Sequence, residues 1–187
     1  MDPHFISSSL SVLQGFIRKD NKEKSLQYVI KFDRLMRLSL ENARESSVKL
    51  KDEISALESY LKLQELQFEQ VFNYCIKAYE GFEEDEIKIP PTLLQPFVEN
   101  AVIHGIRRQG YKGIISIKIE RMDHYLNCII EDNGIGLNEP ETNHRKRSLS
   151  TIITKERLEI LGRQTGNPAS LLIIDRMASG WFWISPL

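Results

Sequence analysis

The chain has 187 residues, of which 41% are hydrophobic, and its 25 Lys and Arg residues almost balance its 26 Asp and Glu residues to leave a formal net charge of −1. This length is sufficient for one or two domains that bury a core without disulfide support. The balanced charge excludes the bulk basic field that would hold a nucleic acid or an anionic membrane, and the apolar runs are far shorter than the roughly 18 residues of a transmembrane helix.

The first third of the chain has the apolar spacing of amphipathic helices. Near the amino terminus, apolar residues recur at spacings of four, three and four, at Ile6, Leu10, Leu13 and Ile17. A polar turn at residues 19–21 separates this stripe from a second one over residues 26–40. A third stripe covers residues 54–68, after an interruption at residues 44–47. We expect an antiparallel hairpin of two long helices, the second continuous or kinked near residues 44–50.

A single hairpin of this kind leaves its apolar stripe half covered. Association of two copies into a four-helix bundle would bury the remainder, so we expect a homodimer formed through the amino-terminal helices. In the third stripe, Glu58 and Lys62 have the spacing of an outward i,i+4 ion pair.

After Gln70 the apolar period changes from helical to alternating. Five segments are predicted to be strands, at residues 72–76, 115–119, 126–130, 170–174 and 181–184. One helix is expected to begin at Pro96, and another to cover residues 149–161 and to end at Gly162.

These elements predict an α+β fold for the carboxyl-terminal part, with a mixed sheet of about five strands and helices on one face. With the helical hairpin in front of it, the chain divides into two expected domains, residues 1–70 and residues 71–187.

The two cysteines, Cys75 and Cys128, stand alone in apolar neighbourhoods and form no C-x-x-C pair. This spacing argues against a disulfide framework and against a thiolate metal site. We expect both side chains to be buried as small hydrophobic groups in a reducing compartment.

The segment LLQPFVENAVIHG, residues 93–105, combines a polar and an apolar helix face. Asn100 and His104 are i,i+4 neighbours, so an amide and an imidazole share one face of the predicted helix. Apolar residues, Phe97 and Val102 among them, lie on the opposite side. An asparagine on an amphipathic helix is most often solvated or capping, so this segment needs a second one to indicate a site.

The second segment is IIEDNGIGL, residues 129–137, a predicted strand that ends in a carboxylate and continues into a glycine-containing loop. Asp132 at the strand end can accept a hydrogen bond from an exocyclic amine, while Gly134 and Gly136 allow the backbone to approach a phosphate or a ring closely. Asn133 followed by Gly134 is also the strongest short turn signal, so a β-hairpin is the alternative interpretation.

In this order the two segments resemble the N box and the first glycine box of the GHKL ATP-binding fold, which is shared by histidine kinases, gyrase-type ATPases, Hsp90 and MutL. MDPHFI at residues 1–6, followed by Ser9 and Leu10, is similar to the phosphoacceptor motif N-P-H-F-[LI]-F-N-S-L of LytS/YehU-type sensor histidine kinases. Leu-Gln-Pro at residues 94–96 is similar to that family's form of the N box, and Glu-Arg-Leu at residues 156–158 is similar to its E-R-L helix. The resemblance extends over nearly the whole chain.

The resemblance implies that residues 1–70 are a dimerisation and phosphoacceptor hairpin and that residues 71–187 are a GHKL ATP-binding catalytic domain. His4 would take the γ-phosphoryl group of ATP, and Asn100 would help to hold Mg²⁺ against the triphosphate. Asp132 would bind the adenine amino group. The other nucleotide-binding positions that the resemblance implies are Gly134 and Gly136, beneath the nucleotide, and His104, which faces it.

The chain departs from the family pattern at several positions. Ile103 replaces the basic residue of the N box, and Trp181 stands where a threonine is expected. The second glycine box, normally G-x-G-L, is SLST at residues 148–151, where Ser148 and Ser150 replace the glycines of the lid over the phosphates. These departures bear on ATP affinity and turnover and not on the fold.

The implied function is that of a protein histidine kinase: the core of a two-component sensor that autophosphorylates on His4 and passes the phosphoryl group to an aspartate of a response regulator, typically of the LytTR class. The resemblance also implies a membrane-spanning sensor upstream, so we expect this chain to be the cytoplasmic portion of a longer bacterial inner-membrane protein, with no direct contact to nucleic acid. Two alternatives stay open: a dimeric signalling scaffold with weak or no nucleotide turnover, and an ATPase in which Glu99 activates water.

Overall fold

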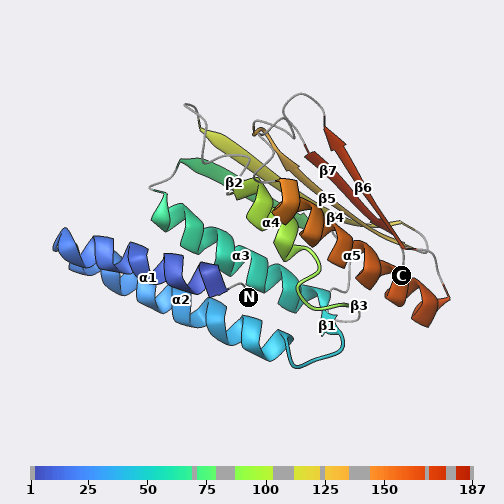
Figure 1. The fold of residues 1–187 in the computed structure, drawn as a ribbon, viewed down its shortest axis with the longest axis horizontal. Helices are drawn as coiled ribbons and strands as arrows, with labels where there is room; N and C mark the ends of the chain where they lie inside the picture. The colour runs from blue at the N-terminus through green and yellow to red at the C-terminus, as the bar shows by residue number, and fades with distance from the viewer. Residues whose placement is uncertain are drawn as a thin grey trace.

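The computed structural model describes residues 3–68, 71–78, 87–102, 112–122, 125–134, 144–166, 169–175 and 180–185. In chain order its elements are α1 (Pro3–Arg18), α2 (Lys22–Asn42), β1 (Val48–Lys49), α3 (Leu50–Gln67), β2 (Phe72–Ala78), β3 (Lys88–Ile89), α4 (Gln95–Asn100), β4 (Gly113–Met122), β5 (Tyr125–Asp132), α5 (His144–Thr165), β6 (Ser170–Asp175) and β7 (Gly180–Ser185) (Figure 1). Over these ranges, no helix combines the length and the apolar character that a bilayer crossing requires.

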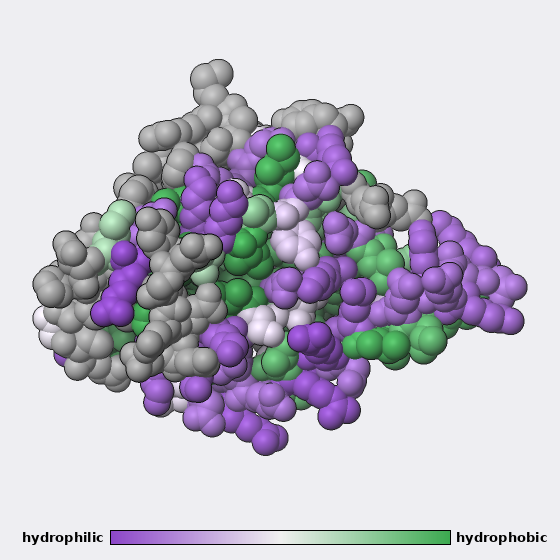
Figure 2. Space-filling model, turned by 180° about the vertical axis from the view of Figure 1, so that it is seen from behind, coloured by the Kyte–Doolittle hydropathy of each residue, from purple (hydrophilic) through white to green (hydrophobic). Residues whose placement is uncertain are grey.

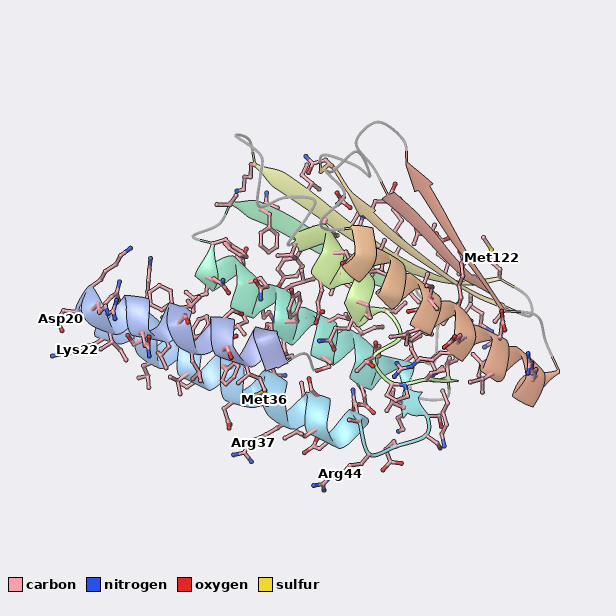
Figure 3. The ribbon with its side chains drawn as sticks, viewed as in Figure 1. Asp20, Lys22, Met36, Arg37, Arg44 and Met122 are labelled. Atoms are coloured by element: carbon pink, nitrogen blue, oxygen red, sulfur yellow. The ribbon has the colours of Figure 1, made fainter. Side chains whose placement is uncertain are left out.

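The turn between α1 and α2 is fixed by backbone and side-chain caps. Asp20, at the tip of the hairpin in Figure 3, adopts a left-handed φ of 51°, which aspartate tolerates better than most residues. Its N–H donates to the carbonyl of Ile17 and the N–H of Asn21 donates to the carbonyl of Phe16, both at 3.0 Å, as in a Schellman motif. The Asn21 side chain then caps α2 by accepting from the N–H of Lys24 at 3.0 Å.

The expected second long helix is two helices, α2 and α3, separated by residues 43–49. The chain leaves the helical conformation because β1 pairs with β3 in an antiparallel ladder, with Val48 opposite Ile89. The N–H of Leu50, the first residue of α3, also donates to the carbonyl of Ile87 at 2.8 Å. At this pairing the chain reverses, and α3 runs back beside α2, between that helix and the sheet (Figure 1).

The described strands β2, β4 and β5 form one hydrogen-bonded sheet and β6 and β7 form another, and because β7 lies beside β5 the five strands make up one mixed layer. β2 is parallel to β4, β4 is antiparallel to β5, and β6 is antiparallel to β7, which lies beside β5. Helices α3, α4 and α5 cover one face of this sheet, and α1 and α2 form a further helical layer outside α3 (Figure 1). The α+β prediction with helices on one face is therefore confirmed.

One hydrophobic core runs from the helical hairpin to the sheet. Leu35 of α2, Leu57 and Leu61 of α3, and Ile117 of β4 are all buried within it. α3 packs against α2 on one side and against β2 on the other. The division into domains at residue 70 stays a prediction, because α3 contributes to the packing of both parts.

The last helix is longer than predicted. α5 begins at His144 and passes through Gly162, which the sequence pattern placed at its end. It stops where Gly166 adopts a left-handed φ of 74°, the conformation in which glycine commonly terminates a helix. A glycine inside a helix costs only about 1 kcal/mol relative to alanine, so packing can carry the helix past Gly162.

Burial of both cysteines was expected, and for Cys75 this is wrong. Cys128 on β5 is buried, and burial raises its pKa to about 12. Cys75 is exposed because Phe72, Tyr74 and Ile76 take the inward face of β2, and alternate residues of a strand point to opposite faces. Both thiols are free, as predicted.

Candidate functional site

Helix α4 lies within the segment at residues 93–105 and ends in two polar residues. Pro96 lies in its first turn, where a missing N–H costs nothing. The apolar side is buried in the core, as predicted, at Phe97, Val98, Ala101 and Val102. Glu99 and Asn100, the last two residues of the helix, are only half-buried. The helix thus has a fixed apolar side and a carboxylate and an amide accessible at its end.

Glu99 interacts with a residue of its own helix and, through its charge, with Tyr60 of α3. The Gln95 amide donates to Glu99 Oε1 at 2.8 Å along one side of α4. Tyr60 of α3 is fully buried, and burial together with the negative charge of Glu99 raises its pKa well above 10. The rings of Tyr60 and Phe5 lie 5.8 Å apart, so the residue after His4 packs beside the neighbour of Glu99. The start of α1 therefore lies on α3, close to the polar end of α4.

The end of β5 is shaped by its own loop. The Asn133 side chain accepts from the N–H of Ile114 at 2.6 Å, and the Asn133 N–H donates to the Ile114 carbonyl at 3.2 Å, which extends the pairing with β4 by one residue. Asp132 Oδ1 accepts from the N–H of Gly134 at 2.8 Å. These bonds turn the chain immediately after β5 and orient the half-buried Asp132 carboxylate.

Asp132 lies on the face of the sheet that the helices cover. It is opposite Ile115, while Ile130 is opposite Ile117, and these positions alternate along one face of the ladder. Cys128 belongs to the same series, and its raised pKa has a contribution from the negative charge of Glu53 on α3. The Asp132 carboxylate and helices α3 and α4 therefore share one layer of the molecule.

Tyr60 of α3 is related to two of the predicted motifs. Its ring lies beside that of Phe5, and the charge of Glu99 near the end of α4 contributes to its raised pKa. α3 leads into β2, whose first residue, Phe72, is opposite Gly113 at the start of β4. The start of β4 is also the end at which Asp132 pairs. The start of α1 therefore lies beside the middle of α3 (Figure 1), and the end of β5 lies at the end of the sheet where α3 leads into β2.

Sequence reasoning missed a group of residues that hold the segment in front of α4. Glu53 of α3 is 1% exposed, and its two carboxylate oxygens accept from the N–H groups of Thr92 at 2.9 Å and Leu94 at 3.1 Å. Burial raises the pKa of Glu53, although these backbone N–H groups favour its charged form. A signal was present, because Glu53 stands on the buried stripe of α3 between Leu50 and Leu57, where an apolar residue is the rule.

Arg157 of α5 holds the same segment from the other side. Its Nη1 donates to the Pro91 carbonyl and to Thr92 Oγ1, both at 3.1 Å. Arg157 is the arginine of the Glu-Arg-Leu motif, and the motif alone predicted no contact for it. The segment from residue 91 to residue 94 is thus bound by α3 and by α5.

The roles of the predicted site residues stay predictions. Asn100 is the last residue of α4, Asp132 is the last residue of β5, and Gly134 follows in the turn after β5. His4 lies in the first turn of α1, where only its main chain is described, and His104 and Gly136 lie outside the described residues, as does Ile103.

The donor chemistry of this end fits Mg²⁺ and a purine nucleotide. Amide and carboxylate oxygens are ligands that Mg²⁺ accepts, and it normally keeps several waters and takes further oxygens from substrate phosphates. Asn100 could supply such an oxygen, and Asp132 could accept from an exocyclic amine. Among the described residues, His, Cys, Asp and Glu side chains form no group of three that could hold a metal ion.

Residues 1–72 match the family model described as histidine kinase. The sensor protein LytS of Oceanobacillus iheyensis is 32% identical over 139 residues, which cover 74% of this chain and 23% of the relative. A sensor-like histidine kinase of Staphylococcus epidermidis, itself uncharacterized, is 33% identical over 148 residues, which cover 79% of this chain and 28% of the relative. The chain spans about a quarter of the length of these curated relatives.

The fold has a solved counterpart in the histidine kinase domain of a blue-light-activated histidine kinase from Erythrobacter litoralis. The TM-score is 0.59 at 12% identity, and the match covers 97% of this chain and 94% of that chain. At this identity the likeness shows the fold alone, which is that of a helical region followed by an α+β part with a mixed sheet, as predicted. The amino-terminal part of the chain, residues 1–72, belongs to the histidine kinase family, and the chain is related to the LytS-type sensor proteins.

Proposed function

We propose that this chain is the kinase core of a two-component sensor, which binds ATP with Mg²⁺, transfers the γ-phosphoryl group to His4 and then passes it to an aspartate of a response regulator. The observation that carries the proposal is the position of Tyr60 on α3. Its ring lies beside that of Phe5, the residue after His4, and the negative charge of Glu99, the residue before Asn100, contributes to its raised pKa.

The proposed step is an in-line displacement at the γ-phosphorus. The lone pair of a neutral imidazole nitrogen of His4 forms the new N–P bond, the bond from phosphorus to the β,γ-bridging oxygen breaks, and ADP leaves with that electron pair. The proton of the other ring nitrogen is then free to leave to solvent. When bound, Mg²⁺ supplies charge neutralisation on the triphosphate, which is most of what phosphoryl transfer needs besides positioning.

The chain itself contributes positioning. The Asp132 carboxylate, oriented by the Gly134 N–H, would accept from the adenine amino group. The Asn100 amide oxygen would hold the metal ion, and Gly134, Gly136 and His104 would lie against the nucleotide. In this proposal α1 brings His4 to the γ-phosphate, because Phe5 seats the start of that helix on Tyr60.

We also propose that the active form is a homodimer through α1 and α2. Large apolar side chains on these two helices remain well exposed in the single chain, at Leu10, Ile17, Leu26, Val29, Ile30 and Leu40. Figure 2 shows apolar surface along one edge of the arm that α1 and α2 form. A second copy that packs on this stripe would complete a four-helix bundle.

The proposed partner in signalling is a response regulator of the LytTR class, as the resemblance to LytS/YehU-type sensor histidine kinases implies. Because the curated relatives are sensor proteins about four times as long as the matched part, we propose that the chain works as the cytoplasmic portion of a bacterial inner-membrane sensor. Contact with nucleic acid would then be made by the regulator.

A dimeric scaffold that turns over little or no ATP is the second candidate. Residues 148–151, which correspond to the second glycine box, belong to helix α5 and include Ser148 and Ser150 where the family has glycines. A regular helix here favours a lid that opens and closes less readily than a glycine loop. The departures at Ile103 and Trp181 favour the same candidate.

Incubation with γ-labelled ATP and Mg²⁺ separates the candidates. The kinase predicts acid-labile, base-stable label on the chain, lost in His4→Gln and in Asn100→Asp. A scaffold predicts no label and no thermal shift with Mg²⁺ and ATP, and this result would refute the kinase. Release of phosphate without label on the chain would indicate an ATPase.

A further inference from the structure

The segment before α4 contains a strained residue. Thr92 has a left-handed φ of 55°, which is a genuine outlier for a β-branched side chain. Such a conformation costs free energy and persists only where the surroundings determine it, often next to a functional site. The left-handed conformation of Thr92 must therefore be held by the residues around it.

Thr92 is held by bonds from two helices. Its N–H donates to Glu53 Oε2 of α3, and its Oγ1 accepts from Nη1 of Arg157 of α5. The second carboxylate oxygen of Glu53 accepts from the N–H of Leu94. We define Glu53, Thr92 and Arg157 as the entry clamp of α4.

The entry clamp also supplies what a capping box would supply. Leu94 is the N-cap residue of α4, and in a capping box its N–H would be accepted by a Glu or Gln at the third helical position, which Phe97 occupies here. The carboxylate of Glu53, on α3, accepts from the Leu94 N–H instead. Since a buried N–H group without an acceptor is costly, the position of this segment depends on Glu53.

A displacement of residues 92–94 at the entry clamp would also move the other end of α4. The helix has only six residues, so roughly 9 Å separate its two ends at 1.5 Å per residue. Its apolar side is packed in the core at Phe97 and Val98, which makes it move as a rigid unit. A shift at residues 92–94 therefore reaches Asn100.

We propose that Glu53, Thr92 and Arg157 are positioning residues of the nucleotide site, which fix the entry of α4 and so place the Asn100 amide against the metal ion on the triphosphate. This inference rests on the proposed function, because it assigns to the clamp a part in binding Mg²⁺ with ATP. It also links α5, the helix that follows the first glycine box, to α4 through a single guanidinium group.

The contribution of the clamp can be measured as the gain in affinity that Mg²⁺ gives. The affinity for a β,γ-imido analogue of ATP is determined by calorimetry with Mg²⁺ and with EDTA, and the ratio of the two affinities is the gain. Substitution of groups that orient a metal ligand typically lowers metal affinity 10- to 100-fold, so Glu53→Gln should reduce the gain about tenfold. Arg157→Gln should reduce it about threefold, because its side chain is exposed to water.

Matched controls are available on the same two helices. Glu58→Gln changes an exposed carboxylate of α3 that pairs with Lys62, and Arg163→Gln changes an exposed guanidinium of α5. Both should leave the gain unchanged. In case Glu53→Gln does not fold, Thr92→Gly provides a second test, because glycine adopts the left-handed φ without strain but offers Arg157 no hydroxyl acceptor.

The affinity in EDTA and the thermal unfolding of the nucleotide-free chain complete the test. The proposal predicts that the clamp variants keep the metal-free affinity and lose the gain. The positioning role is refuted if the clamp variants keep the wild-type gain from Mg²⁺. It is also refuted if their affinities with Mg²⁺ and with EDTA both fall in proportion to a lower unfolding temperature. In either case the kinase proposal stands. If the wild-type chain binds no nucleotide with either addition, the proposed function and this inference are both refuted.

Discussion

Replacing Ile30 by aspartate puts a charge in the middle of the apolar stripe on α2. Ile30 is 60% exposed in the single chain, so a partner helix that covers it would contribute about 1 to 2 kcal/mol of apolar burial per chain. In a two-fold dimer both copies are affected, which removes about 2 to 4 kcal/mol before the new charge is considered. At 1.4 kcal/mol for each factor of ten, the dissociation constant of the dimer should rise at least about thirtyfold.

Sedimentation equilibrium of the wild-type and Ile30→Asp chains measures this change directly. Ile160→Asp on α5 is the matched control, since Ile160 is 53% exposed but lies outside the α1–α2 stripe. Circular dichroism should show that both variants keep the wild-type fold, because both positions are exposed. If Ile30→Asp associates as tightly as the wild-type chain, the stripe is not the dimer interface and the reasoning from its exposure is wrong.

Three further predictions concern titration, thiol reactivity and nucleotide recognition. Burial raises the pKa of Glu53 above its ordinary 4.5, so the folded chain holds this proton more tightly and the free energy of unfolding should fall as pH rises through the raised pKa. Urea titrations at increasing pH should show this slope in the wild-type chain but not in Glu53→Gln, and parallel curves would contradict it. An aromatic disulfide reagent should modify Cys75 in the native chain and Cys128, with its pKa of about 12, only after unfolding; two rapid native thiols would refute this. Asp132→Asn should weaken ATP binding about tenfold in calorimetry, since a hydrogen bond to a charged acceptor is lost, and an unchanged affinity would exclude the adenine contact.

The periods of apolar residues predicted most of the helices and strands, because burial of one face leaves a repeat in the sequence. The break between α2 and α3 has no such repeat. It arises where Val48 pairs with Ile89, in a ladder of two residues on each strand, and a pairing so short and so distant along the chain leaves no local pattern. The extension of α5 through Gly162 was missed for a related reason, since tertiary packing outweighed the weak helix propensity of glycine.

For the site, motif spacing predicted the residues that lie at the ends of elements. Asn100 ends α4 and Asp132 ends β5, and such positions can be read from hydrophobic runs and the polar residues that follow them. Glu53 is different, because its partners are backbone N–H groups of residues 92 and 94 that only the tertiary fold brings to it. A charged residue on an apolar helix stripe indicates that it is buried with a hydrogen-bond partner, but the sequence does not show which residue that partner is.

In the proposed function the chain acquires a phosphoryl group on His4. The most direct measurement is the position of the phosphoryl group after reaction with γ-labelled ATP and Mg²⁺, determined by mass spectrometry of peptides prepared at alkaline pH. We expect acid-labile phosphate on the peptide that contains His4 and none in the His4→Gln chain. Phosphate on another residue, or a chain that binds ATP yet gains no phosphate, would contradict the proposed function.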